Sequence, residues 1–184
     1  MAAIALSLHE EDHFVATTTY VPVATYLRSS YEPDAEYVDG EIEERPMGEH
    51  DHAAWQAAIQ RWFFAHEQEW NIEVLPEYRV QVAETRFRVP DVAVMDFSFP
   101  AERIATRPPI AAFEILSPED TVHRMRRKLA DYAKMGIPQI WVIDPEDGVS
   151  LRYLDGELLR GEVFEEPSRG ISFRIEEIGK LLRR

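Results

Sequence analysis

The chain has 184 residues, 45% of them hydrophobic and 29% charged, which is typical of a soluble globular protein with a substantial core. Cysteine is absent, which excludes disulfides, thiolate catalysis and cysteine-ligated metal sites. No apolar run approaches the ~20 residues that span a bilayer, and the N-terminus lacks the basic start of a secretory signal. We therefore expect a cytoplasmic protein without a membrane partner. The formal net charge of −14 opposes nucleic-acid binding, since phosphates favour a basic surface.

No repeat, low-complexity tract or Gly/Ser linker divides the sequence. We expect one domain over residues 20–184, preceded by a flexible N-terminal arm of residues 1–19. Apolar spacing and turn residues predict the elements of the first half. In chain order these are a helix over residues 21–30, a hairpin over 37–42 around an Asp-Gly turn, a helix over 51–69, and strands over 72–83 and 89–97.

The second half begins with a compact apolar strand over residues 110–116. The elements predicted after it are a helix over 121–135, strands over 139–143, 149–153 and 162–164, and a closing helix over 173–182. The strand–helix–strand unit over 110–143 is best built as a parallel crossover. Together these elements predict an α/β fold, in which a mixed β-sheet is flanked by helices.

Two acidic residues interrupt apolar strands in the middle of the chain. Asp91 opens the strand that follows Pro90, and Glu114 lies between Phe113 and Ile115. Burying an ionised carboxylate is costly unless a cation, a metal or hydrogen-bond donors compensate it. Two such acids on neighbouring strands would form the oxygen-rich site that hard divalent cations prefer. Taken singly, each has an ordinary explanation, because Asp91 could cap a turn and Glu114 could pair with an arginine.

Strand alternation predicts which way these two acids face. It places Asp91 on the face of Ala93, and Glu114 on the face of Ala112 and Leu116. A shared metal ion requires the two carboxyl groups to converge, and an ion held there could activate water for phosphodiester cleavage.

Five segments, in this order, resemble the Uma-type restriction endonuclease family of the PD-(D/E)XK nuclease superfamily. They are Tyr37-Val-Asp-Gly-Glu41-Ile with the helix near His52, Pro90-Asp91, Glu114-Ile-Leu-Ser-Pro, the Lys-bearing helix ending Tyr132-Ala-Lys-Met-Gly136-Ile-Pro, and Trp141-Val-Ile-Asp-Pro145. The resemblance spans about residues 20–153, which is most of the chain.

This resemblance implies a restriction endonuclease-like fold in which Asp91 and Glu114 bind Mg²⁺ or Mn²⁺ and the substrate is DNA. The superfamily's lysine lies two residues after the glutamate, where this chain has Leu116. The resemblance assigns that lysine's role to Lys128 on the following helix. It also makes Glu41 a third or a water-mediated metal ligand.

These accessory assignments have ordinary alternatives. Lys128 could be a solvated lysine in the basic run of residues 123–128, and Glu41 could be a strand-edge glutamate. His52 shares a helical face with Trp55 and Ile59, so we expect a core-facing histidine that at most lines the site.

The leading hypothesis is a Mg²⁺- or Mn²⁺-dependent endonuclease that hydrolyses DNA phosphodiester bonds, with Asp91, Glu114, Glu41 and Lys128 as its catalytic residues. A homodimer would suit the cutting of both strands. The alternative is a nuclease fold that no longer cleaves and serves as an interaction or regulatory module, which the acidic charge and Leu116 favour. A metal-independent hydrolase that acts on sugars through a carboxylate pair is the third hypothesis.

Overall fold

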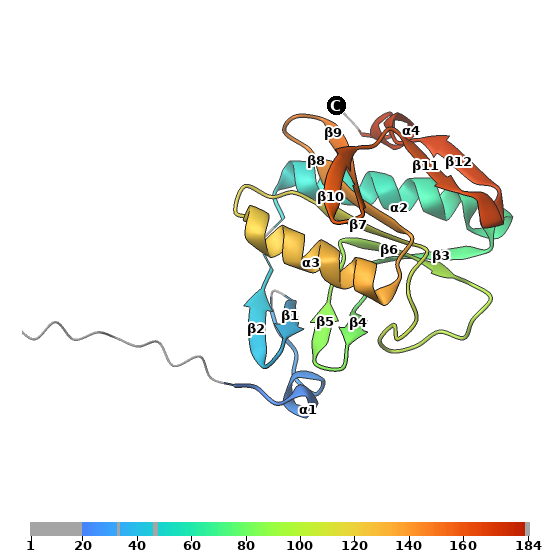
Figure 1. Ribbon diagram of the computed structural model, residues 1–184. Helices are drawn as coiled ribbons and strands as arrows, with labels where there is room; N and C mark the ends of the chain where they lie inside the picture. The colour runs from blue at the N-terminus through green and yellow to red at the C-terminus, as the bar shows by residue number, and fades with distance from the viewer. Residues whose placement is uncertain (1–19, 33, 46–47, 183–184) are drawn as a thin grey trace, which may run out of the picture.

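Over residues 20–32, 34–45 and 48–182, which the computed structural model describes, the chain forms four α-helices and three β-sheets (Figure 1). The helices are α1 (Val23–Tyr26), α2 (His50–Trp70), α3 (Val122–Met135) and α4 (Glu176–Gly179), with a 3-10 helix over Pro167–Arg169. The strands are β1 (Ala35–Val38), β2 (Glu41–Glu44), β3 (Ile72–Pro76), β4 (Val80–Ala83), β5 (Arg86–Arg88), β6 (Val92–Asp96), β7 (Ala111–Ile115), β8 (Gln139–Asp144), β9 (Val149–Leu154), β10 (Glu157–Arg160), β11 (Val163–Glu166) and β12 (Ile171–Arg174).

A six-stranded sheet in the order β10-β9-β8-β7-β6-β3 forms the centre of the fold. Its neighbouring strands are antiparallel, except that β7 and β8 run parallel and are connected through α3. The predicted crossover over residues 110–143 and the mixed α/β architecture are therefore confirmed.

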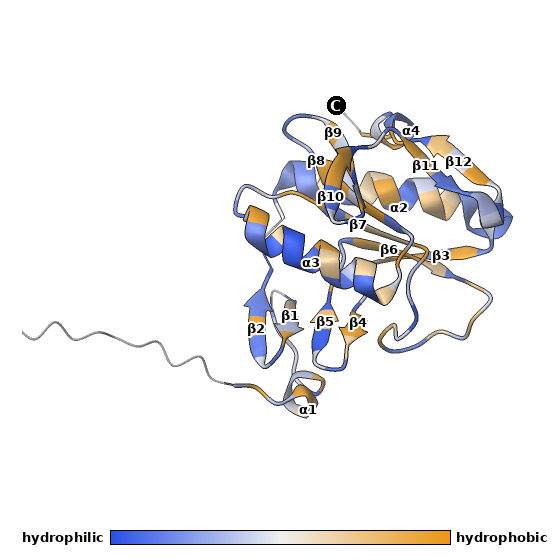
Figure 2. Cartoon of the chain, viewed as in Figure 1, coloured by the Kyte–Doolittle hydropathy of each residue, from blue (hydrophilic) through white to orange (hydrophobic). Residues whose placement is uncertain are grey.

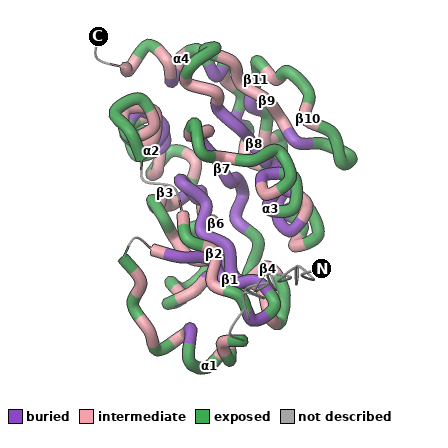
Figure 3. The backbone as a smooth tube through the Cα atoms, turned by 90° about the vertical axis from the view of Figure 1, so that its left-hand side faces the viewer, coloured by how far each residue is buried: buried purple, intermediate pink, exposed green. Residues whose placement is uncertain are grey.

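The two long helices cover opposite faces of this sheet, with the buried strands between them (Figure 3). Successive side chains of β7 point to opposite faces, so Phe113 packs with Phe63 of α2 while Ala112 packs with Leu129 of α3. Figure 2 shows the same division, since the central strands are mainly hydrophobic and α3 turns hydrophilic residues outward. Glu114 follows this alternation and lies on the α3 side, the face that the sequence predicts for it.

The boundaries of α3 follow from its capping residues. Thr121 precedes the helix, and its side-chain oxygen accepts a hydrogen bond from the backbone N–H of Arg124. Gly136 ends the helix with a φ of 93°, a conformation that glycine adopts without steric cost. The predicted helix over residues 121–135 is thus confirmed, with Thr121 as its cap.

A separate four-stranded sheet has the order β2-β1-β5-β4. The β1–β2 hairpin turns at Asp39 and Gly40, whose φ values of 51° and 105° confirm the predicted tight turn. The chain leaves this sheet at Arg88, the end of β5, and enters the six-stranded sheet at Val92, the start of β6. Residues 89–91 therefore connect the two sheets.

Three predicted elements are corrected. The strand over residues 72–83 divides into β3 and β4, which belong to different sheets, because Glu77 takes a φ of 49° that breaks the extended chain. The helix over 21–30 shortens to Val23–Tyr26, and the closing helix over 173–182 begins as β12, since residues 171–174 pair with β11. The predicted arm of residues 1–19 lies outside the described residues. Among the described helices, none is long and apolar enough to cross a membrane.

Two adjacent phenylalanines of α2 provide a test of this packing. Phe63 is fully buried, whereas Phe64 is 69% exposed. We expect Phe63→Ala to lower the free energy of unfolding by about 3–5 kcal/mol, because it removes buried apolar contacts and leaves a cavity. Phe64→Ala should change it by about 0.5 kcal/mol or less. Urea denaturation measures both, and equal losses would refute the assignment of the core face.

Candidate metal centre

The predicted site residues Asp91, Glu114 and Lys128 meet where the two sheets join. Asp91 ends the connection between β5 and β6, Glu114 lies in β7, and Lys128 lies on α3. All three are buried, with exposed fractions of 3%, 2% and 7%. The three residues and His52 line a common cavity of about 30 Å³, which is enough for about one water molecule or metal ion.

Asp91 is held by donors from three parts of the chain. Its Oδ2 accepts a hydrogen bond of 2.7 Å from the backbone N–H of Ile115, which ties it to the end of β7. The same oxygen lies 3.2 Å from Nε2 of His52, at the start of α2. Oδ1 accepts a hydrogen bond of 2.5 Å from Arg45, which directly follows β2. The carboxylate is therefore fixed in place by its neighbours.

Glu114 and Lys128 form a buried ion pair. The Lys128 Nζ lies 2.6 Å from Oε2 of Glu114, and the Tyr132 hydroxyl donates to Oε1 at 2.6 Å. Nζ also donates to the backbone carbonyl of Val89 at 3.1 Å. Residues 114, 128 and 132 belong to the β7–α3 unit, so a single crossover positions the acid, the lysine and the tyrosine.

Glu36 of β1 completes the environment of this lysine. Its Oε1 lies 2.8 Å from Lys128 Nζ and accepts a hydrogen bond from the backbone N–H of Val89. Its Oε2 accepts from Arg88 at 2.8 Å. The guanidinium of Arg88 also pairs with Asp131 of α3, and it is fully buried. Lys128 therefore bridges an acid of each sheet.

Burial and neighbouring charges shift the pKa values of these groups. Burial raises the pKa of Glu114 to about 7, because the charges of Asp91 and Glu36 add to desolvation and Lys128 only partly offsets them. Burial also acts to raise the pKa of Asp91, but the hydrogen bond from His52 and the charges of Lys128 and Arg45 hold it below its usual value. The hydrogen bond to Asp91 raises the pKa of His52.

The cavity wall is mixed in charge. It is lined by Arg45, His52, Asp91, Glu114, Ile115, Ser117, Asp120, Arg124, Met125 and Lys128. The charged residues of the wall are thus two arginines, one lysine and one histidine against three carboxylates, although the whole chain is strongly acidic.

A family model for Uma2, described as "putative restriction endonuclease", matches residues 23–175 of the chain. The chain belongs to the Uma2 family. The resemblance seen in the sequence is therefore confirmed, and the match includes every residue named above as part of the site. No significant match was found among curated proteins.

A crystal structure of a putative nuclease belonging to DUF820 from Anabaena variabilis ATCC 29413 has the same fold. It is 22% identical, covers 89% of this chain and 99% of its own, and superposes with a TM-score of 0.75. The restriction endonuclease-like fold expected for a Uma2 protein is thus confirmed. A cryoEM structure of a DrdV–DNA complex also matches, with 16% identity over 69% of this chain and 11% of that one, but its TM-score of 0.40 is too low to support an argument.

Two sequence assignments of this Uma2 chain have a different environment from the one predicted. Glu41 is exposed at the start of β2, opposite Val38, and does not line the cavity. The buried upstream acid is Glu36, on the partner strand of the same hairpin. His52 does not face the core as expected. It reaches Asp91 and lines the cavity, which is the position that the sequence analysis allowed for it at most.

The sequence analysis missed Glu36, Arg45 and Arg88. A signal for Glu36 is present, because it stands between Ala35 and Tyr37 as Glu114 stands between two apolar residues. The entire strand β1 is buried, which is the same situation that singled out Glu114. Nothing in the local sequence indicates that Arg45 would reach Asp91, 46 residues away.

The residues of the cavity fit a divalent cation in ligand type and space. Asp91 and Glu114 supply hard carboxylate oxygens to a cavity of about the size of one ion. Each carboxylate oxygen has two acceptor positions, so an oxygen that already accepts from Lys128 or Arg45 keeps one lone pair for a metal. A cluster of three or more acidic or histidine side chains arranged to hold a metal is absent from the described residues, so water or backbone oxygens would complete the coordination.

Arg88 provides a test of the buried charge network. We expect Arg88→Leu to destabilise the protein by about 3–5 kcal/mol, because Glu36 and Asp131 would remain buried without their shared cation. Arg174 is a matched control, since it pairs with two acids, Glu162 and Glu176, but its side chain is 52% exposed.

Arg174→Leu should cost about 1 kcal/mol or less. Chemical denaturation measures both variants. Similar losses would show that burial of the network adds nothing to the stability of the fold.

Proposed function

We propose that this Uma2 protein is a Mg²⁺- or Mn²⁺-dependent endonuclease that hydrolyses DNA phosphodiester bonds. The observation that carries the proposal is the convergence of Asp91 and Glu114 on one small cavity, beside a buried lysine. Membership of a family described as putative restriction endonucleases supports the same reaction class.

Asp91 and Glu114 would hold the ion. The chemistry that a divalent cation supplies at such a site is activation of water and neutralisation of charge on the phosphate. The backbone N–H of Ile115 and the His52 ring fix the orientation of the Asp91 carboxylate, so its oxygens face the cavity before substrate arrives. Such fixed geometry reduces the reorganisation that binding and catalysis require.

Lys128 would orient the attacking water or offset charge on the phosphate. Its ammonium is held by Glu114, Glu36 and the carbonyl of Val89, which restricts its position. Because this lysine lies on α3, the fold brings it next to Glu114 without a lysine at position 116. Glu36 is the buried acid of the hairpin that also contains Glu41, but it does not line the cavity, so it would act by positioning Lys128 and not as a metal ligand.

Arg45 and Arg124 line the same cavity and would contact the phosphate backbone. Their charges, with those of Lys128 and His52, make the surroundings of the cavity less acidic than the chain as a whole. Local cations of this kind would offset part of the repulsion between DNA and a protein of charge −14.

The decisive measurement is plasmid cleavage with Mg²⁺, Mn²⁺ or EDTA. We expect cleavage that EDTA abolishes and that Asp91→Asn or Glu114→Gln reduces by about 100-fold or more, since several kcal/mol of transition-state stabilisation depend on the ion. These substitutions keep the shape of the side chain and remove its charge. Cleavage that survives both would refute the site.

Two exposed acids outside the cavity provide matched controls for this assay. Asp147→Asn and Glu69→Gln make the same chemical changes and should leave cleavage unchanged. In the same assay Glu36→Gln should reduce cleavage more than Glu41→Gln does. A larger loss of cleavage in Glu41→Gln than in Glu36→Gln would instead support Glu41 as the functional acid of this hairpin.

A second candidate function is a nuclease-derived module that binds a partner and does not cleave. One observation favours it, because all four carboxylate oxygens of Asp91 and Glu114 already accept from protein donors. A metal would have to share these oxygens with Arg45, Lys128 and their neighbours, which weakens its binding.

Calorimetric titration with Mn²⁺ separates the two functions. For the enzyme we expect binding to the wild type, and a dissociation constant at least about ten times higher for Asp91→Asn, since a charged ligand contributes about 1.4 kcal/mol or more. Asp147→Asn should bind Mn²⁺ as the wild type does. A wild type that binds neither Mn²⁺ nor DNA at low salt would instead support the non-cleaving module.

A further inference from the structure

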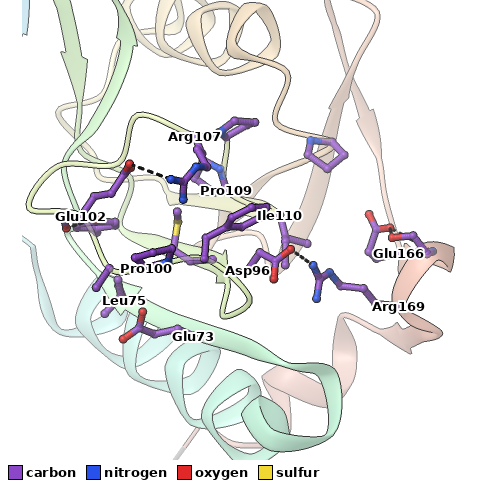
Figure 4. A pocket seen from close by; sticks show the side chains of 17 residues that line it. Glu73, Leu75, Asp96, Pro100, Glu102, Arg107, Pro109, Ile110, Glu166 and Arg169 are labelled. Atoms are coloured by element: carbon purple, nitrogen blue, oxygen red, sulfur yellow. Dashed lines mark hydrogen bonds and ion pairs between the residues drawn. The ribbon is translucent and has the colours of Figure 1, made fainter.

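A second, larger pocket lies at the other end of β6 from the candidate metal centre. Figure 4 shows the side chains that line it. Its volume is about 670 Å³, within the range of about 300–1,000 Å³ that is usual for small-molecule sites. Asp96 ends β6 at this pocket, whereas Asp91 precedes the same strand at the metal centre. The two cavities share no lining residue.

The wall of this pocket, which we call the β3–β6 pocket, is largely apolar. Leu75 of β3, Met95 of β6 and Ile110 contribute aliphatic surface, and Tyr78 and Phe99 contribute aromatic rings. Prolines 100, 108, 109 and 138 add rigid apolar surface around it. Such a wall favours a ligand with an aromatic or aliphatic body.

The charged residues of the pocket are mostly committed to each other. Arg169 pairs with Asp96, and Arg107 lies 3.5 Å from Glu102 and 4.6 Å from the centre of the Phe99 ring (Figure 4). The lining thus holds two arginines that are already neutralised.

Glu73 differs from the other acids of the β3–β6 pocket. Glu166 accepts hydrogen bonds from Ser168, whereas Glu73 has neither a hydrogen bond nor an ion pair with its side chain among the described residues. It is half-buried on β3, next to Leu75 in Figure 4. Four acids against two arginines give the lining a formal charge of −2, which Glu73 and Glu166 carry. Of these two, Glu73 is the one that has no donor among the described residues.

We propose that the β3–β6 pocket binds a small organic cation, which consists of an ammonium or guanidinium group on an aromatic or aliphatic body. The body would contact the apolar wall, and the cation would pair with Glu73. Partial enclosure lowers the local dielectric, which strengthens this pairing relative to one in open solvent. The same charge distribution repels anionic ligands of equal shape. This site is independent of the proposed nuclease activity.

Calorimetry with tryptamine as the probe tests the proposal, and indole-3-propionate is its anionic counterpart. We expect the wild type to bind tryptamine at millimolar concentration and to bind indole-3-propionate at least about tenfold more weakly. Glu73→Gln should weaken tryptamine binding by about tenfold, which corresponds to about 1.4 kcal/mol. Glu69→Gln, an exposed glutamate of α2 outside the pocket, should leave it unchanged.

A second variant, Leu75→Trp, fills the apolar wall and should also weaken tryptamine binding while Glu73 remains in place. Circular dichroism confirms that each variant is folded. The proposal is overturned if the wild type does not bind tryptamine, if it binds both indoles equally, or if Leu75→Trp binds as the wild type does. It is likewise overturned if folded Glu73→Gln retains full affinity.

Discussion

The buried ammonium of Lys128, which lies between Glu36 and Glu114, is the contact on which the arrangement of the protein depends. An unpaired charge of either sign would be costly at this depth, so each of the three groups needs the others. Because Glu36 belongs to the four-stranded sheet, Glu114 to the six-stranded sheet and Lys128 to α3, their neutralisation fixes the two sheets and the helix relative to one another. Arg88 reinforces this link through Glu36 and Asp131.

The same charges that join the sheets also form the proposed site. In the proposed mechanism Lys128 would act on water or phosphate from the position in which two acids hold it. The Asp91 carboxylate at the cavity wall is likewise held by Ile115, His52 and Arg45. The same residues therefore stabilise the fold and form the proposed site, so we expect a substitution among them to change both stability and cleavage. The β3–β6 pocket shares no residue with this charge network, so a substitution in the pocket leaves the ion pairs of Lys128 in place.

Much of the fold could be predicted from periodicity and capping. The apolar stripe of α2, the extent of α3 and the parallel β7–α3–β8 unit are local patterns that tertiary contacts reinforced. The errors arose where local patterns are ambiguous. Residues 72–83 look like one strand until Glu77 turns the chain, and residues 173–182 have apolar spacing that suits a helix although residues 171–174 pair as a strand.

The sequence alone determined that Asp91 and Glu114 are acids within apolar strands and that Glu114 shares a strand face with Ala112 and Leu116, because alternation is a local property of the chain. Only the tertiary structure decided which partners compensate those acids. Glu36, Arg45 and Lys128 come from segments far apart in the chain, and their approach depends on how the two sheets pack. Local patterns indicate that a buried charge needs a partner, but they do not indicate which one it has.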